Sequence, residues 1–88
     1  MSYEVAISRR AQKSLTRIRP ADRDKVRAAI FALSEDPRPH GVWMLKGKRG
    51  DYLRLRVRDY RVIYRVQEEI LTVLVIRVGH RREVYRNL

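Results

Sequence analysis

The sequence predicts an α+β fold in which two helices pack against an antiparallel sheet. Apolar residues recur at helical spacing between positions 9 and 33, whereas from position 53 onward they alternate with charged residues or run continuously. The chain has 88 residues, which is the size of one domain. We therefore expect a single domain over residues 1–88: an N-terminal strand, a helical hairpin, a three-stranded antiparallel meander and a short C-terminal tail.

The chain opens with a strand and a short helix. Residues 3–7 alternate between apolar and polar side chains, which is typical of a half-buried strand. Ser8 then offers a hydroxyl that can cap the amino end of a helix. A helix over residues 9–18 follows, because its apolar side chains share one face: Ala11, Leu15 and Ile18.

A second helix follows closely, so we expect the two to form a hairpin. Pro20 fits the first turn of a helix, and Asp22 and Asp24 lie near its positive end. The Glu-Asp-Pro sequence at residues 35–37 ends it. The apolar residues in between form one stripe, which we assign to the core: Val26, Ala29, Ile30 and Leu33.

Residues 37–50 combine prolines, glycines and charged side chains, and predict a loop with a short turn around residues 42–45. Trp43 lies in this segment beside Met44 and Leu45. A lone tryptophan among apolar neighbours more often anchors a loop to the core than stacks on RNA. We therefore expect Trp43 to be such an anchor, with RNA stacking as the alternative.

Three strands follow, at residues 53–58, 60–66 and 70–76. The first two alternate apolar and polar side chains, with a turn at residues 58–59. The third is almost continuously apolar, so we expect it to be buried on both faces of the sheet and to end at Gly79.

The register of the first hairpin follows from its length. If residues 58–59 form a two-residue loop, the strands pair Val57 with Tyr60, Leu55 with Val62 and Leu53 with Tyr64. All six side chains are apolar or aromatic, so they form the core face. A slip of one residue would mix charged side chains into this face, which supports the register.

The other face of this hairpin then carries three arginines. Arg56 lies opposite Arg61, and Arg54 lies beside both. Like charges directly opposite each other destabilise a sheet, so we interpret the cluster as a site for an anion. The alternative is that the arginines extend into water or pair with nearby acids: Asp51, Glu68, Glu69 or Glu83.

Composition narrows the function. The chain has 21 Lys and Arg against 10 Asp and Glu, a net charge of +11, which favours nucleic acid or a nucleoprotein as partner. It has no cysteine and only two histidines, so we expect no disulfide, no metal site and no cofactor. It lacks an apolar run of about 18 residues and a signal peptide, so we expect no membrane association and a cytoplasmic protein.

Three motifs resemble the RelE family of toxins: residues 59–64 (DYRVIY), residues 75–81 (VIRVGHR) and residues 83–85 (EVY). The likeness covers roughly residues 3–86. It implies a RelE-like fold and ribosome-dependent cleavage of mRNA in the ribosomal A site. The family uses no metal: the 2′-hydroxyl attacks the adjacent phosphate. The implied partners are the ribosome, mRNA and a cognate antitoxin protein.

The resemblance also assigns site residues. The family's catalytic residues match Arg61, Arg81 and Tyr85, and two family lysines fall at Arg54 and Arg56. Arginine does not act as a base, because it keeps its proton. The base is then Tyr85, His80, Glu83 or a ribosomal RNA group. Other side chains are expected to contact RNA: Lys46, Lys48, Arg49, Arg58, His80 and Arg82.

Two other functions share this basic scaffold. One is a ParE-like toxin that inhibits DNA gyrase without nuclease activity. The other is an RNA- or ribosome-binding protein that performs no chemistry.

Overall fold

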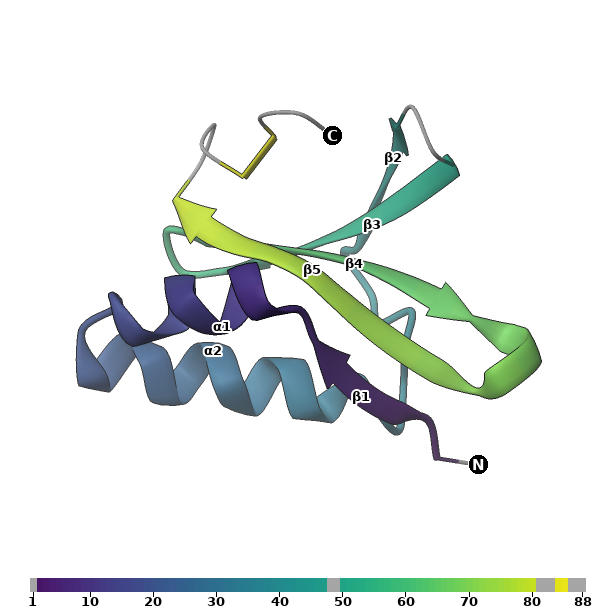
Figure 1. Cartoon of the computed structure of the whole chain (residues 1–88), viewed down its shortest axis with the longest axis horizontal. Coiled ribbons are helices and arrows are strands. Elements are labelled where there is room, and N and C mark those ends of the chain that lie inside the picture. Colours follow the sequence, from purple (N-terminus) through teal and green to yellow (C-terminus); the bar gives the residue numbers. More distant parts are fainter. Residues whose placement is uncertain (1, 48–49, 81–83, 86–88) are drawn as a thin grey trace.

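The computed structural model describes residues 2–47, 50–80 and 84–85. Within this part of the chain a five-stranded sheet has the strand order β1-β5-β4-β3-β2, and both helices lie on one face of it (Figure 1). β1 pairs in parallel with β5, and the other neighbours are antiparallel. The elements are β1 (Glu4–Ile7), α1 (Arg9–Thr16), α2 (Pro20–Ala32), β2 (Trp43–Gly47), β3 (Gly50–Val57), β4 (Tyr60–Gln67), η1 (Glu68–Ile70) and β5 (Thr72–His80). The predicted α+β class is confirmed.

The helices begin where the capping residues predict. Ser8 Oγ accepts a hydrogen bond from the Ala11 amide at 3.1 Å and donates one to the Ile76 carbonyl at 2.7 Å. The cap therefore also joins α1 to β5. Pro20 occupies the first turn of α2, and the helix ends at Ala32, three residues before the predicted boundary.

The main core lies between the helices and the sheet. It includes the predicted helical stripes and the apolar face of the β3–β4 hairpin. Its fully buried side chains come from every layer: Leu15, Val26, Ile30, Leu33, Val62, Tyr64, Val73 and Val75. Tyr64 also donates a 2.6 Å hydrogen bond to the Pro37 carbonyl, which ties the segment after α2 to the sheet.

The predicted β3–β4 register is confirmed. Val57 pairs with Tyr60, Leu55 with Val62, Leu53 with Tyr64 and Arg56 with Arg61. Arg58 takes a left-handed conformation, with φ of 53°, at the start of the two-residue turn.

The prediction of a loop over residues 37–50, with a short turn around residues 42–45, is wrong. β2 forms within it and pairs with β3, from Trp43 opposite Arg54 to Gly47 opposite Gly50. An edge strand has a partner on one side only, so it can leave its large side chains in solvent, and this segment lacks the alternation that marks buried strands.

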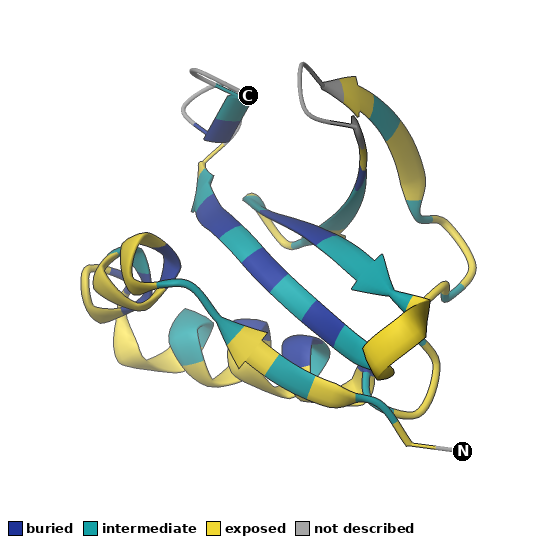
Figure 2. Ribbon diagram, turned by 45° about the vertical axis from the view of Figure 1, so that its right-hand side comes forward, coloured by how far each residue is buried: buried dark blue, intermediate teal, exposed yellow. Residues whose placement is uncertain are grey.

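The prediction that the last strand is buried on both faces is also wrong. Along β5 buried residues alternate with half-buried ones (Figure 2), because both helices pack on the same face. The strand also starts and ends later than expected. Ile70 is exposed in η1, and Leu71 has a φ of 47°, so the strand runs from Thr72 to His80.

Candidate functional site

The sheet face opposite the helices carries Arg54, Arg56 and Arg61, and we call these three residues the arginine face. Side chains on paired residues of adjacent strands point to the same side of a sheet, and Arg56 pairs with Arg61 while Arg54 pairs with Ile63. Ile63 is fully buried on this side, in a second small cluster with Tyr52 and Val84. The arginines therefore surround a local apolar patch.

Arg54 is held from two directions. Its Nη1 donates a hydrogen bond to the Tyr85 hydroxyl at 3.1 Å, and its guanidinium carbon lies 5.3 Å from the centroid of the Trp43 ring. Its Nε is buried and makes no hydrogen bond within the described part of the chain. Arg54 therefore joins an aromatic ring of β2 to the phenol of the short turn at residues 84–85, which we call the C-terminal turn.

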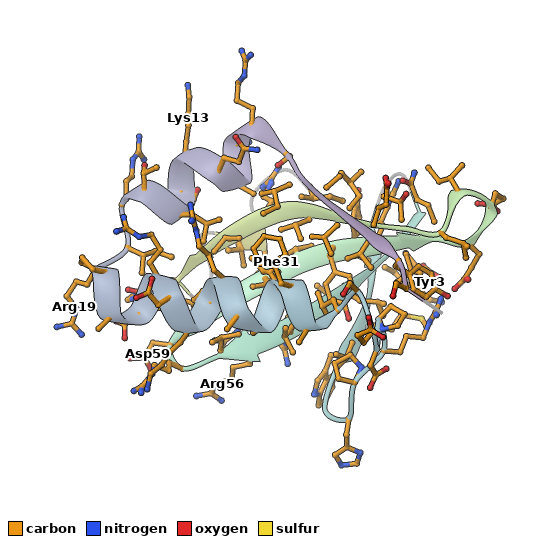
Figure 3. All side chains as sticks on the ribbon, turned by 90° about the horizontal axis from the view of Figure 1, so that it is seen from below. Tyr3, Lys13, Arg19, Phe31, Arg56 and Asp59 are labelled. Atoms are coloured by element: carbon orange, nitrogen blue, oxygen red, sulfur yellow. The ribbon has the colours of Figure 1, made fainter. Side chains whose placement is uncertain are left out.

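Arg56 and Arg61 differ in their contacts. The Arg56 Nε donates to the Arg58 carbonyl at 3.2 Å, and Figure 3 shows Arg56 near Asp59 at the turn end of the hairpin. Arg61 is half-buried and makes no hydrogen bond or ion pair among the described residues. Of the three arginines, Arg61 is the most available for an anion.

Two of the acids expected to neutralise these arginines, Glu68 and Asp51, lie elsewhere. Glu68 forms an ion pair with Arg38 at 2.9 Å and accepts a hydrogen bond from Tyr3 at 2.8 Å. The hydrogen bond from Tyr3 lowers the pKa of Glu68 the most, and the contact with Arg38 lowers it further. Asp51 pairs across the strands with Lys46, on the face away from the arginines. Within the described residues no carboxylate forms an ion pair with the arginine face, which favours the anion-site interpretation.

The C-terminal turn packs over the arginine face because residue 79 has no side chain. Gly79 pairs with Arg61 on β4, and a Cβ built on Gly79 would lie 3.0 Å from Val84 Cγ1. Val84 is 2% exposed and contacts the cluster around Ile63. This close approach brings the next residue, Tyr85, within hydrogen-bonding distance of Arg54.

His80 does not join the arginine face. It pairs with Tyr60, and the two rings meet edge to face with centroids 4.4 Å apart on the helix side of the sheet. The reason is a bulge in β5: Ile63 pairs with Arg77 whereas Tyr64 pairs with Val75, so Ile76 is an extra residue. A bulge of one residue reverses the alternation of the side chains that follow it.

Two other predicted RNA contacts also lie off the arginine face. Lys46 lies on the opposite face of β2 from Trp43, and Arg58 reaches Asp22 of α2 at 3.9 Å. The remaining predicted site residues lie outside the described residues: Lys48, Arg49, Arg81 and Arg82, together with Glu83.

Trp43 is not a loop anchor. Its side chain is 64% exposed on β2, on the same side of the sheet as Arg54. To predict the exposure of Trp43, the sequence would have had to indicate β2 and its register with β3. The glycines and prolines around β2 indicated a loop instead.

The chain matches, over residues 5–85, the family described as ParE toxin of type II toxin-antitoxin system, parDE. The chain belongs to this toxin family. It is 32% identical over 91 residues to Toxin RelG of Mycobacterium tuberculosis, covering 98% of this chain and 99% of that protein. The protein is therefore a type II toxin of the RelE/ParE family, as its motifs indicate.

Solved structures agree with this assignment. The toxin superposes on a chain of the RelBE2 toxin-antitoxin complex of M. tuberculosis with a TM-score of 0.81 and 28% identity, covering 92% of this chain and 100% of that one. It superposes on the isolated Escherichia coli RelE toxin with a TM-score of 0.76 and 30% identity, covering 96% and 92%. The RelE-like fold is confirmed.

The toxin has a second basic site, which the sequence did not predict. A pocket of about 310 Å³ between α1 and the end of β5 is lined by Arg10, Lys13, Ser14, Arg17 and Arg77, with Val78, Gly79 and Val84. Arg77 is only 9% exposed, and burial lowers its pKa, as does the charge of Arg10. Lys13 projects from α1 toward solvent (Figure 3). Among the described residues, four cations and no carboxylate line this pocket.

The described part of the toxin offers neither a cluster of metal ligands nor a membrane-spanning helix. No group of three or more His, Asp or Glu side chains there is placed to hold a metal ion. No helix there is long and apolar enough to cross a membrane.

Proposed function

We propose that this toxin is a ribosome-dependent endoribonuclease that cleaves mRNA in the A site and so inhibits translation. The observation that carries the proposal is the arginine face: Arg61 is half-buried without a partner among the described residues, and Arg54 is bonded to a phenol nearby. A site that holds positive charge, with no carboxylate partner among the described residues, suits a phosphate, and a hydroxyl beside it suits proton transfer.

The proposed reaction needs three events at one phosphate. The ribose 2′-oxygen forms a bond to phosphorus as its proton leaves, the bond to the 5′-oxygen breaks, and that oxygen takes up a proton. The products are a 2′,3′-cyclic phosphate and a free 5′-hydroxyl. Arg61 and Arg54 stabilise the added negative charge on the phosphorus oxygens, and Arg81 joins them by its place in the family motif. Such groups typically contribute about 10²–10³ in rate each.

We assign Tyr85 to proton donation. Its oxygen accepts a hydrogen bond from the Arg54 guanidinium, so the phenol proton points elsewhere and is available to the leaving 5′-oxygen.

We propose that the base is a group of the ribosome. Arg54 and Arg56 retain their protons, and His80 is on the opposite face of the sheet. A base supplied by ribosomal RNA explains why cleavage would need the ribosome. Full loss of cleavage in Glu83→Gln would instead assign the base to Glu83.

We also propose a cognate antitoxin as partner, in the cytoplasm where ribosomes are. Toxin–antitoxin complexes have been solved for the similar proteins of M. tuberculosis and Pyrococcus horikoshii. An acidic chain that covers the arginine face would neutralise the charge that RNA needs.

The second candidate is inhibition of DNA gyrase without nuclease activity. The matched family is described by its ParE members, and arginine at positions 54 and 56 removes two candidate bases. Such a toxin would not need the Arg54–Tyr85 hydrogen bond.

One pair of assays separates the two functions. Purified toxin is added to programmed 70S ribosomes, the mRNA ends are mapped by primer extension, and DNA supercoiling by gyrase is measured in parallel. We expect codon-phased cuts with cyclic phosphate ends, normal supercoiling, and at least a tenfold slower reaction for Tyr85→Phe. Intact mRNA with blocked supercoiling would contradict the proposal and support the gyrase function.

A further inference from the structure

We propose that Trp43 and Arg54 form a stacking platform for a nucleobase of single-stranded RNA, on a nucleotide next to the scissile one. The inference rests on the proposed nuclease function and adds to it a residue that contacts the substrate. It comes from three observations: the exposure of Trp43, its contact with Arg54, and its place relative to Arg61 in the strand register.

Trp43 exposes an indole that the fold does not use. Its side chain is 64% exposed, although Leu45, two residues along the same face of β2, packs against the buried cluster around Tyr52. The same strand face can therefore bury an apolar side chain. Large exposed aromatic rings on a basic sheet surface are typical of proteins that stack RNA bases.

Arg54 fixes one side of the indole. Its guanidinium lies over the ring, 5.3 Å from the centroid, and is itself held by the hydrogen bond to Tyr85. A cation over one face of an indole restricts the ring and leaves the other face for a base. The free face of the indole and the guanidinium of Arg54 would then both lie against a negatively charged strand, and Tyr85 contacts the same guanidinium.

The register places the platform at a useful distance from the proposed reaction centre. Trp43, Arg54 and Ile63 form a row across β2, β3 and β4, and Arg61 lies two residues from Ile63 along β4. With strands about 4.8 Å apart and a rise of about 3.3 Å per residue, the Cα atoms of Trp43 and Arg61 are about 12 Å apart. Trp43 is therefore too far to contact the phosphate at Arg61, and close enough to take the base of a neighbouring nucleotide.

Every base has a flat face that can stack on an indole, so the platform should show little preference among the four bases. It should bind a nucleotide with a base more tightly than an abasic one. Removing such a contact typically costs about 1–3 kcal/mol per base, which corresponds to about a 5- to 150-fold weaker interaction. We expect Trp43→Ala to lose this amount and Trp43→Phe to lose much less.

The chain has one tryptophan, so its fluorescence reports on the platform alone. The toxin is titrated with a short 2′-deoxy oligonucleotide, which cannot be cleaved, and with an abasic oligomer of the same length. Binding of both is followed by the anisotropy of an attached dye. We expect the bound base-containing strand to quench the tryptophan and the bound abasic strand to leave it unchanged. The proposal would be overturned if both bound strands quenched the tryptophan equally, or if neither bound strand quenched it.

A second test uses cleavage on programmed ribosomes. Met44 is the matched control, because it is 65% exposed on the same strand and points to the opposite face. We expect Trp43→Ala to raise KM at least fivefold, Trp43→Phe to stay near wild type, and Met44→Ala to have no effect. Equal effects of Trp43→Ala and Met44→Ala would contradict the platform. If wild-type toxin cuts no mRNA, the nuclease function fails, and the fluorescence titration still decides whether Trp43 stacks on bases.

Discussion

Replacing Gly79 by alanine tests whether the C-terminal turn positions Tyr85 for the reaction. The added Cβ would lie 3.0 Å from Val84 Cγ1, and ordinary van der Waals contact begins at about 3.4 Å. Val84 must therefore move away by about 0.4 Å. If Tyr85 moves with it, its hydrogen bond to Arg54 lengthens from 3.1 Å to about 3.5 Å, at which little bond strength remains.

The expected effects on stability and activity differ in size. Overpacking costs about 1–3 kcal/mol, and a more restricted unfolded chain returns about 0.4–1 kcal/mol, so the free energy of unfolding falls by about 1 kcal/mol. A hydrogen bond to a charged group is worth about 1.5–3 kcal/mol. Its loss therefore predicts about a 10- to 150-fold slower cleavage.

The assay compares Gly79→Ala with Ile30→Val. Ile30 is fully buried on α2, on the helix side of the sheet, and this change typically costs about 0.5–1.5 kcal/mol. The two variants should unfold at similar urea concentrations, and only Gly79→Ala should cleave programmed mRNA slowly. Equal cleavage by both variants would refute the positioning role of the turn.

Three further predictions follow from the described contacts. Burial raises the pKa of Tyr64 to about 12, whereas the unfolded value is near 10. The buried, neutral phenol of Tyr64 thus stabilises the fold fully below pH 10. This stabilisation, about 3 kcal/mol, is lost as the pH rises from 10 to 12. Urea unfolding of Tyr64→Phe should not show this loss. Arg58→Gly should raise the melting temperature, because its φ of 53° costs a non-glycine residue about 1 kcal/mol; a lower melting temperature would contradict this. The double variant Lys13→Ala and Arg17→Ala removes two cations of the α1–β5 pocket and should reduce the slope of log affinity for single-stranded RNA against log salt by about 1.4; an unchanged slope would exclude phosphate contacts there.

The β3–β4 hairpin was predictable because two independent signals agree on it. A two-residue turn fixes the register, and the same register places three apolar or aromatic side chains of each strand on one face. The arginine face then follows without further assumptions. The helix stripes were predictable for a similar reason, because their apolar spacing matches one buried face.

β2 and the position of His80 were not predictable by the same means. Trp43 and Met44 are adjacent in β2, so their side chains point to opposite faces of the sheet. Both remain exposed because β2 is an edge strand. No apolar alternation marks such a strand. The β5 bulge is set by pairing with β4, and it turns His80 to the helix side although the sequence there reads as an unbroken strand.

The most direct test of the proposed function is the cleavage rate of Arg61→Ala on saturating programmed ribosomes, beside Arg27→Ala. Arg27 is exposed on α2, so both variants lose one positive charge and only one changes the arginine face. We expect Arg61→Ala to cleave at least 100-fold more slowly, with circular dichroism and melting close to wild type, and Arg27→Ala to cleave within twofold of wild type. Wild-type cleavage by a folded Arg61→Ala toxin would show that the arginine face does not hold the scissile phosphate.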